Sequence, residues 1–169
     1  KGSGANERDR ANTLGVSLVR DKTNWNAEEA SGGMSENLSV ARAERWFGGT
    51  ERFTNVIFEH KGYLGVTRET VFAQHLAVAT SLDTDRGRYS VGGDVIVLDQ
   101  LFLQDEFTLR GYSLGEFEGE NVVVHNLEFR FPLIRDINFP MWPYTWLYVK
   151  KLKAALFDDV GFVFDRDGK

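Results

Sequence analysis

The sequence predicts an all-β protein of antiparallel strands and, within that class, favours a transmembrane β-barrel. The chain has 169 residues, with 17 Gly and 13 Phe but only 3 Pro, and an aromatic-rich composition with few helix-forming runs favours β structure. Apolar and polar residues alternate along much of its length, as they do in strands with one apolar face. No apolar run approaches the roughly 18 residues of a transmembrane helix, whereas a barrel strand needs only about 9–11 residues, every second one apolar.

Four strands are predicted in the first half of the chain, separated by polar or glycine-rich turns. The strands are 13–21, 38–47, 52–64 and 69–82, and the turns are 22–37, 48–51 and 65–68. In the first strand, Leu14, Val16 and Leu18 share one face. The fourth strand has enough Ala and Leu to form a helix instead, but its period of two fits a strand better.

The second half of the chain begins with a long irregular region, 83–120, and adds two more strands. A loop of that length in a compact domain is usually functional or disordered. The strands are 121–132 and 149–164, and the turn region between them, 134–148, contains Trp142, Tyr144, Trp146 and Tyr148. The chain is therefore predicted to have about six antiparallel strands.

Alternation alone does not decide between a soluble lipocalin-like barrel, with its apolar face inward, and a membrane barrel, with its apolar face outward. Three features favour the membrane barrel. The predicted strands run to 9–16 residues, which is longer than the about 5–6 typical of soluble sheets. The aromatic residues at 142–148 stand at a strand end, as they would at a membrane interface. Charges on the polar faces suit a water-filled lumen, namely Glu128, Arg130, Lys151, Lys153 and Asp159.

Three motifs follow one another in the second half of the chain. They are Phe107-Thr108-Leu109-Arg110-Gly111-Tyr112, Asn126-Leu127-Glu128-Phe129-Arg130-Phe131-Pro132-Leu133 and Phe157-Asp158-Asp159-Val160-Gly161. Their residues, order and spacing resemble the bacterial surface-antigen family of outer-membrane barrels, and in particular the C-terminal barrel portion of BamA/TamA-type assembly and translocation proteins. The segment 14–33 resembles the preceding strand and turn more loosely. Where the family usually has a Gly pair before the R-G-(F/Y) motif, this chain has Leu103-Gln104-Asp105-Glu106.

The resemblance implies that the region 83–120 folds back into the barrel and places its motif against the inner wall. The loop motif consists of Leu109, Arg110, Gly111 and Tyr112, and its expected lumen partners are Glu128, Phe157, Asp159 and Gly161. A guanidinium in a confined lumen needs an ion pair, because an unpaired buried charge is costly.

Alternation places Glu128 and Asp159 on the polar faces of consecutive strands, so both carboxylates can line one patch of the lumen. We therefore expect Arg110 within hydrogen-bonding reach of Asp159, Glu128 or both, since its planar fork suits a carboxylate. Gly111 would allow a tight bend and Gly161 a close approach of the backbone.

The sequence contains no catalytic constellation, so no enzyme activity, cofactor or metal site is expected. It has no Cys, no nucleophile elbow and no phosphate-binding loop. His60, His75 and His125 lack metal-ligand spacing and are interpreted as structural or lumenal residues. The net charge of −5 argues against a nucleic-acid partner, which would need a basic face. Asp158 fits poorly, because alternation turns it toward lipid.

The resemblance implies membrane-protein insertion or polypeptide translocation at the bacterial outer membrane, with an organellar outer membrane as the less favoured location. The expected partners are the lipid bilayer, an unfolded client or secreted polypeptide, and accessory lipoproteins. One alternative is an anchor or export barrel for a fused enzyme such as a patatin-like lipase. A soluble lipocalin-like binding barrel is a weaker alternative.

Residues 1–169 are expected to be part of one larger barrel domain, with an inward-folding loop at about 83–120. Six strands are too few for a closed membrane barrel, since known barrels have at least about eight. The aromatic segment 142–148 is expected at the periplasmic interface of the membrane.

Overall fold

The computed structural model describes residues 11–26, 29–82, 89–92, 107–135, 139–141, 144–149 and 151–166. This part of the chain is all-β, as predicted, with one 3₁₀ turn, η1 (Arg45–Phe47), and no α-helix. The strands are β1 (Thr13–Asp21), β2 (Asn24–Asn26), β3 (Glu29–Ala43), β4 (Phe53–Gly65), β5 (Val71–Leu82), β6 (Tyr89–Val91), β7 (Phe117–Gly119), β8 (Asn121–Ile134), β9 (Phe139–Met141), β10 (Tyr144–Val149) and β11 (Leu152–Phe164).

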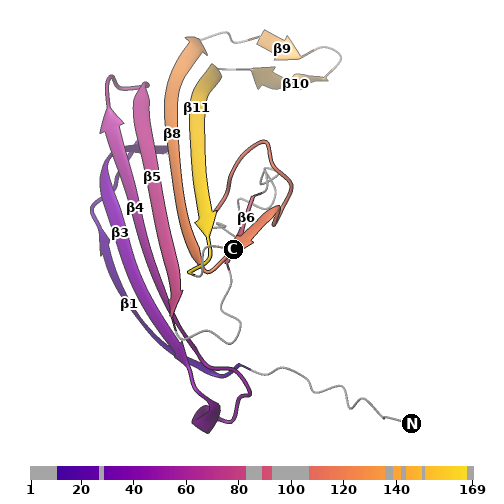
Figure 1. Ribbon diagram of the computed structural model, residues 1–169. Helices are drawn as coiled ribbons and strands as arrows, with labels where there is room; N and C mark the ends of the chain where they lie inside the picture. Colours follow the sequence, from indigo (N-terminus) through magenta and orange to yellow (C-terminus); the bar gives the residue numbers. More distant parts are fainter. Residues whose placement is uncertain are drawn as a thin grey trace.

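The main sheet is antiparallel and has seven strands, in the order β1-β3-β4-β5-β8-β11, with β2 beside β3. Two smaller two-stranded sheets, β6–β7 and β9–β10, form in the connections of the second half. The main sheet is strongly curved, with β1 and β11 at its two ends (Figure 1). The end of the sheet that holds the connection from β5 to β8 is called the loop end, and the end that holds residues 66–70 is called the turn end.

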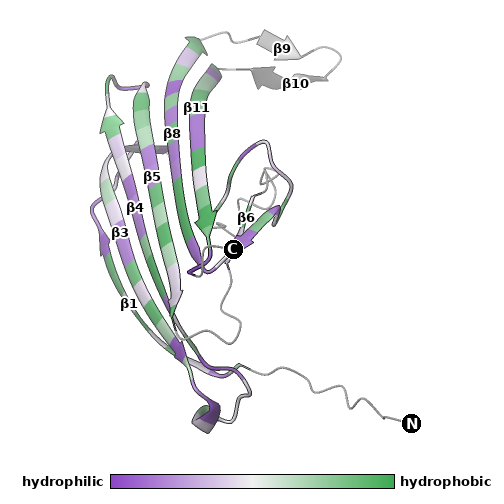
Figure 2. Cartoon of the chain, viewed as in Figure 1, coloured by the Kyte–Doolittle hydropathy of each residue, from purple (hydrophilic) through white to green (hydrophobic). Residues whose placement is uncertain are grey.

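The cross-strand register aligns the two faces that alternation predicts. Phe72 pairs with Phe129, which pairs with Leu156, and all three belong to the outward, convex face. One residue further along, Ala73, Glu128 and Phe157 are partners on the concave face. The strands accordingly show alternating apolar and polar bands (Figure 2). Large apolar side chains outside and polar or small ones inside are the arrangement of a membrane barrel.

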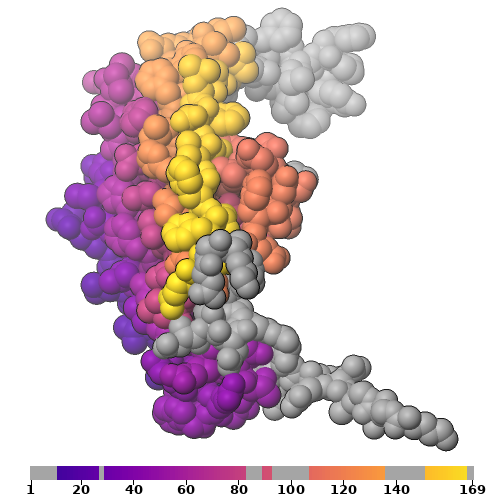
Figure 3. Space-filling model, in the orientation of Figure 1, coloured from indigo at the N-terminus to yellow at the C-terminus, as the bar shows by residue number. Residues whose placement is uncertain are grey.

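The buried core lies between the concave face and the segments that cover it. It consists of Ala77, Ala79, Tyr89, Val91, Phe107, Leu109, Val122 and Val124. The sheet contributes mainly small residues to this core, so the aromatic and branched side chains of the loop have room to pack against it. The loop around residues 107–119 lies beside β11 on this side of the sheet (Figures 1 and 3).

The prediction that residues 22–37 form one turn is wrong. β2 pairs with the first part of β3 as a hairpin, and the glycine pair lies inside β3. Gly33 has a φ of +85°, and a Cβ there would meet the Lys22 carbonyl oxygen at 2.0 Å. The glycine therefore permits two backbone segments to pass closely within a strand, a role that sequence inspection mistook for a turn.

The other predicted strand and turn boundaries differ less from the observed ones. The predicted strand 38–47 is the last part of β3 followed by η1, and the predicted turn region 134–148 contains the antiparallel pair β9–β10. Residues 142 and 143 lie outside the described residues, as do the side chains of 136–150. The interfacial position of 142–148 therefore stays a prediction. In the part of the chain that the structure covers, no helix is long and apolar enough to cross a membrane.

Candidate functional site

The site is built around residues 107–116, called the inner loop. β6 and β7 pair at its base, and the Gly92 N–H donates to the Phe107 carbonyl at 3.3 Å. Phe107 and Leu109 are only 8% and 5% exposed, because they pack against the concave wall. Burying each side chain contributes about 1.5–3 kcal/mol. Apolar packing therefore holds the first residues of the inner loop against the sheet.

Arg110 forms a bidentate ion pair with Asp159 of β11. Its Nε donates to Oδ2 at 2.7 Å and its Nη2 donates to Oδ1 at 2.7 Å. The backbone N–H of Arg110 also donates to Oδ2, at 3.2 Å. The Asp159 side chain is 5% exposed and that of Arg110 is 25% exposed. A carboxylate this buried needs an opposite charge, and the guanidinium fork supplies it through two parallel hydrogen bonds.

Glu128 and Phe157 complete the surroundings of the guanidinium. Nη1 of Arg110 lies 3.8 Å from Oε2 of Glu128, and Cζ lies 3.9 Å from the centre of the Phe157 ring. The second distance is well within the range of a cation–π contact. Glu128 is also paired with Arg130 at 3.1 Å. Asp159 is thus the closest acidic partner of Arg110, while Glu128 lies between Arg110 and Arg130.

Two glycines shape the contact between loop and wall. A Cβ at Gly161 would lie 3.2 Å from Cδ2 of Leu109, so the missing side chain makes room for this leucine. Gly111 has a φ of +88°, in the left-handed region, and nothing lies within 4 Å of its Cβ position. Its role is therefore conformational, since it turns the chain directly after Arg110. Tyr112 makes an edge-on contact with Phe117, with 5.1 Å between the ring centroids.

The structure adds Asn126 to the expected residues. Its Nδ2 donates to the Thr108 carbonyl at 3.1 Å. Asn126 is the cross-strand partner of Asp159 on β11. Alternation had placed it on the same polar face as Glu128, but that signal does not distinguish a residue that binds the loop from one that faces water.

A comparison with protein families identifies a match over almost the whole chain. A family model described as the Omp85 superfamily domain matches residues 2–169. The chain belongs to the Omp85 superfamily. A comparison with curated proteins finds no match.

Omp85 domains are outer-membrane β-barrels of protein transport and membrane-protein assembly, and this all-β chain with transmembrane strands is one of them. In this Omp85 chain, the residues of the three sequence motifs meet around one ion pair. The segment 103–106, where the motif departs from the family's Gly pair, lies outside the described residues.

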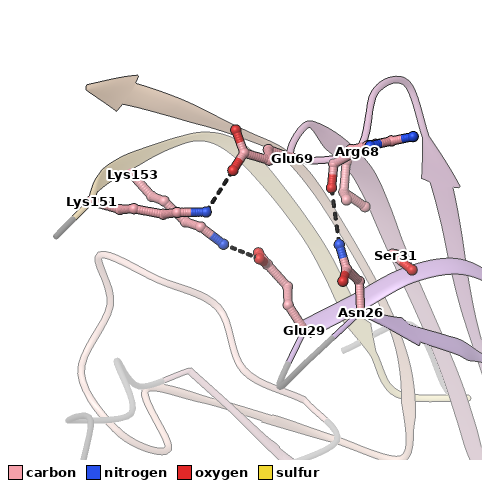
Figure 4. Close-up of a pocket in the computed structure, with 8 residues that line it drawn as sticks. Asn26, Glu29, Ser31, Arg68, Glu69, Lys151 and Lys153 are labelled. Atoms are coloured by element: carbon pink, nitrogen blue, oxygen red, sulfur yellow. Dashed lines mark hydrogen bonds and ion pairs between the residues drawn. The ribbon is translucent and has the colours of Figure 1, made fainter. Parts of the chain in front are cut away.

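A second polar cluster of the Omp85 chain lies at the turn end and consists of Glu29, Glu69, Lys151 and Lys153; it is called the ionic clasp. Lys153 is paired with Glu29, and Lys151 with Glu69 at 2.6 Å, around a hollow of about 140 Å³ (Figure 4). The hydrogen bond from Lys151 lowers the pKa of Glu69. These pairs connect β11 with β3, and the residue just before β11 with the β4–β5 turn, although three strands separate β11 from β3 in the sheet order.

The described residues of the site do not form a metal centre. Among the described residues, no three His, Cys, Asp or Glu side chains form a group that could hold a metal ion. The inner loop instead meets the wall through an ion pair, a hydrogen bond and apolar packing. Such contacts are suited to fixing a segment in one position.

Proposed function

We propose that this chain is part of a BamA/TamA-type barrel of the bacterial outer membrane, which inserts client barrels or passes an unfolded polypeptide. In this proposal the concave face lines the lumen, and the inner loop is a lumenal brace that keeps the barrel wall in its working shape. The partners are the bilayer, the client polypeptide and accessory lipoproteins.

The observation that carries the proposal is the bidentate pair between Arg110 and Asp159. The ion pair lies about halfway along β11, which spans Leu152–Phe164, so the inner loop reaches deep into the concavity. A loop that only capped the end of the sheet would need neither this depth nor a buried carboxylate. The cost of burying charge supports a role in function as well as in folding.

We also propose that further strands complete the barrel. β1 and β11 lie at opposite ends of the sheet order, so each has one edge that the described residues leave unpaired. Unpaired backbone groups in lipid cost several kcal/mol each, roughly, which makes open edges in the hydrocarbon region very unfavourable. Additional strands on both sides would remove this cost and close the wall around the inner loop.

The test is Arg110→Ala in the whole protein, reconstituted in lipid vesicles. Removing the guanidinium leaves Asp159 buried without a charge partner, at a cost of about 3 kcal/mol, the lower end for a broken buried pair. The strand ladders remain, so the barrel should stay folded. The inner loop should become sensitive to protease, and client insertion or translocation should fall.

The matched control is Arg130→Ala. Arg130 lies on the same wall and contacts Glu128, but its loss leaves the bidentate pair of the loop in place. It should change loop protection and activity far less than Arg110→Ala. Full activity of Arg110→Ala with a demonstrably released loop would refute the brace.

A further inference from the structure

A chain of polar contacts crosses the concave wall next to the loop site and is centred on His75 of β5. Its Nε2 lies 2.9 Å from Oε1 of Glu59 on β4, and its Nδ1 lies 3.1 Å from Oδ1 of Asn126 on β8. Lys61 contacts the same oxygen of Glu59 at 2.8 Å. Because Asn126 also bonds the Thr108 carbonyl, the contacts run without a break from β4 to the inner loop.

The orientation of the Asn126 amide is fixed by its neighbours. The Thr108 carbonyl is an acceptor, so the amide nitrogen must face it and donate there. The amide oxygen then faces His75, and Nδ1 of His75 must donate a proton to it. Nε2 faces a carboxylate and must donate as well. These contacts are all satisfied when the imidazole ring carries both protons.

We infer that His75 is a positioning residue for the inner loop, whose ring, held by Glu59, fixes the Asn126 amide that binds the Thr108 carbonyl. The loop thereby has a second anchor beside the Arg110 pair. This inference rests on the proposed role of the loop as a lumenal brace.

Charged and titratable side chains of four elements lie around His75 on the concave wall. They are Glu59, Lys61 and Tyr63 of β4, Glu128 and Arg130 of β8, Arg110 of the inner loop and Asp159 of β11.

The experiment measures amide hydrogen exchange of residues 107–112 in the whole protein in detergent, with all variants compared at one pH. His75→Gln should raise exchange about tenfold or more, the loss expected for a hydrogen bond to a charged group. The control is His125→Gln, one residue from Asn126 but on the convex face, which should leave exchange unchanged.

Asn126→Asp keeps the test decisive if His75→Gln disturbs folding. It retains an acceptor for His75 but presents a carboxylate oxygen to the Thr108 carbonyl, so exchange of the inner loop should rise although the side chain keeps its size. Equal exchange in His75→Gln, His125→Gln and wild type would overturn the inference. Fully additive effects of His75→Gln and Asn126→Asp would overturn it too, because residues acting through one another must couple. If hydrogen exchange shows a released loop in Arg110→Ala while client insertion or translocation is unchanged, the brace is refuted. The His75 anchor is not affected by that result.

Discussion

At the scale of single residues, the geometry of the Arg110–Asp159 pair makes its chemistry specific. Three donors of one residue converge on a nearly buried carboxylate. A lysine would supply charge at one point but no second parallel hydrogen bond. The pair therefore depends on the shape of the guanidinium as well as on its charge.

We predict that Arg110→Lys restores little of the loop protection lost in Arg110→Ala, because an ammonium cannot engage both carboxylate oxygens in parallel. A double-mutant cycle of Arg110→Ala and Asp159→Ala, followed by protease sensitivity of the inner loop, should give a coupling energy of about 0.5–3 kcal/mol. Strict additivity of the two substitutions would show that the observed contact contributes nothing.

The two glycines of the site should respond differently to substitution. Gly161→Val should displace Leu109, whose Cδ2 would lie 3.2 Å from even the first added carbon, and should loosen the inner loop. Gly111→Ala meets no atom within 4 Å, so its cost should be only the strain of a left-handed backbone, about 1–3 kcal/mol. Hydrogen exchange of residues 107–112 checks both. The conformational explanation requires Gly111→Asn to be milder than Gly111→Ala, since Asn tolerates this region.

At the scale of elements, the β2–β3 hairpin is held to β11 at the turn end through the ionic clasp. Gly65 of β4 has no side chain where the Ser31 carbonyl passes, since a Cβ would lie 2.6 Å from that oxygen. The hairpin can therefore lie close to the end of β4. The clasp joins elements that share no strand pairing.

We predict that Lys153→Glu releases the hairpin from β11, because it places two carboxylates together at the clasp. The paired exchange of Lys153→Glu with Glu29→Lys should restore the contact, as it reverses both charges. The distance distribution between spin labels at Trp25 and Leu152 measures the release. A double variant as open as the single one would mean that the ion pair does not hold the hairpin.

The clasp should also open in acid. Lys151 lowers the pKa of Glu69, so the pair contributes stability above the ordinary carboxylate pKa and loses it as the pH falls through the lower folded-state value. Spin labels at Arg68 and Leu152 should move apart over that range. Glu69→Gln should be open at neutral pH and show no further change, and a Glu69→Gln profile that still follows pH would assign the transition to another group.

At the scale of the whole molecule, the sheet separates a lipid-facing surface from a polar one. The convex face is not uniformly apolar, since Glu36 lies there within 3.4 Å of Arg20 and 3.6 Å of His60. Arg20 and Glu36 carry opposite charges, and charges facing lipid require such pairing. Asp158 lies on the same face, paired in register with Leu127, and nothing in the structure explains a carboxylate at that position.

We predict that a single charge distinguishes the two faces of β3. Leu38→Lys places an ammonium on the convex face and should cost about 2–4 kcal/mol near the bilayer midplane. Ser39→Lys, its neighbour on the concave face, should cost much less. Urea titration of folding into lipid vesicles measures both free energies, and equal costs would contradict the assignment of the faces.

Much of the fold could be predicted because strand alternation is a local property. The faces of the predicted strand 69–82 follow from a period of two that needs no knowledge of neighbouring strands, and β5 shows the same faces. The 22–37 segment could not be predicted in this way. A glycine is needed at position 33 because the backbone of Lys22 passes beside it. Such a contact does not appear in a local sequence pattern.

The same division applies to the candidate site. The sequence by itself determined the strand faces, the family motifs and the residue types able to pair, because side-chain direction and charge are local. Only the tertiary structure decided that Asp159 is the closest partner of Arg110 and Glu128 the more distant one, and that Asn126 and His75 join them. Those choices depend on the register between β5, β8 and β11 and on how deeply the inner loop folds, and both are set by packing among residues far apart in the chain.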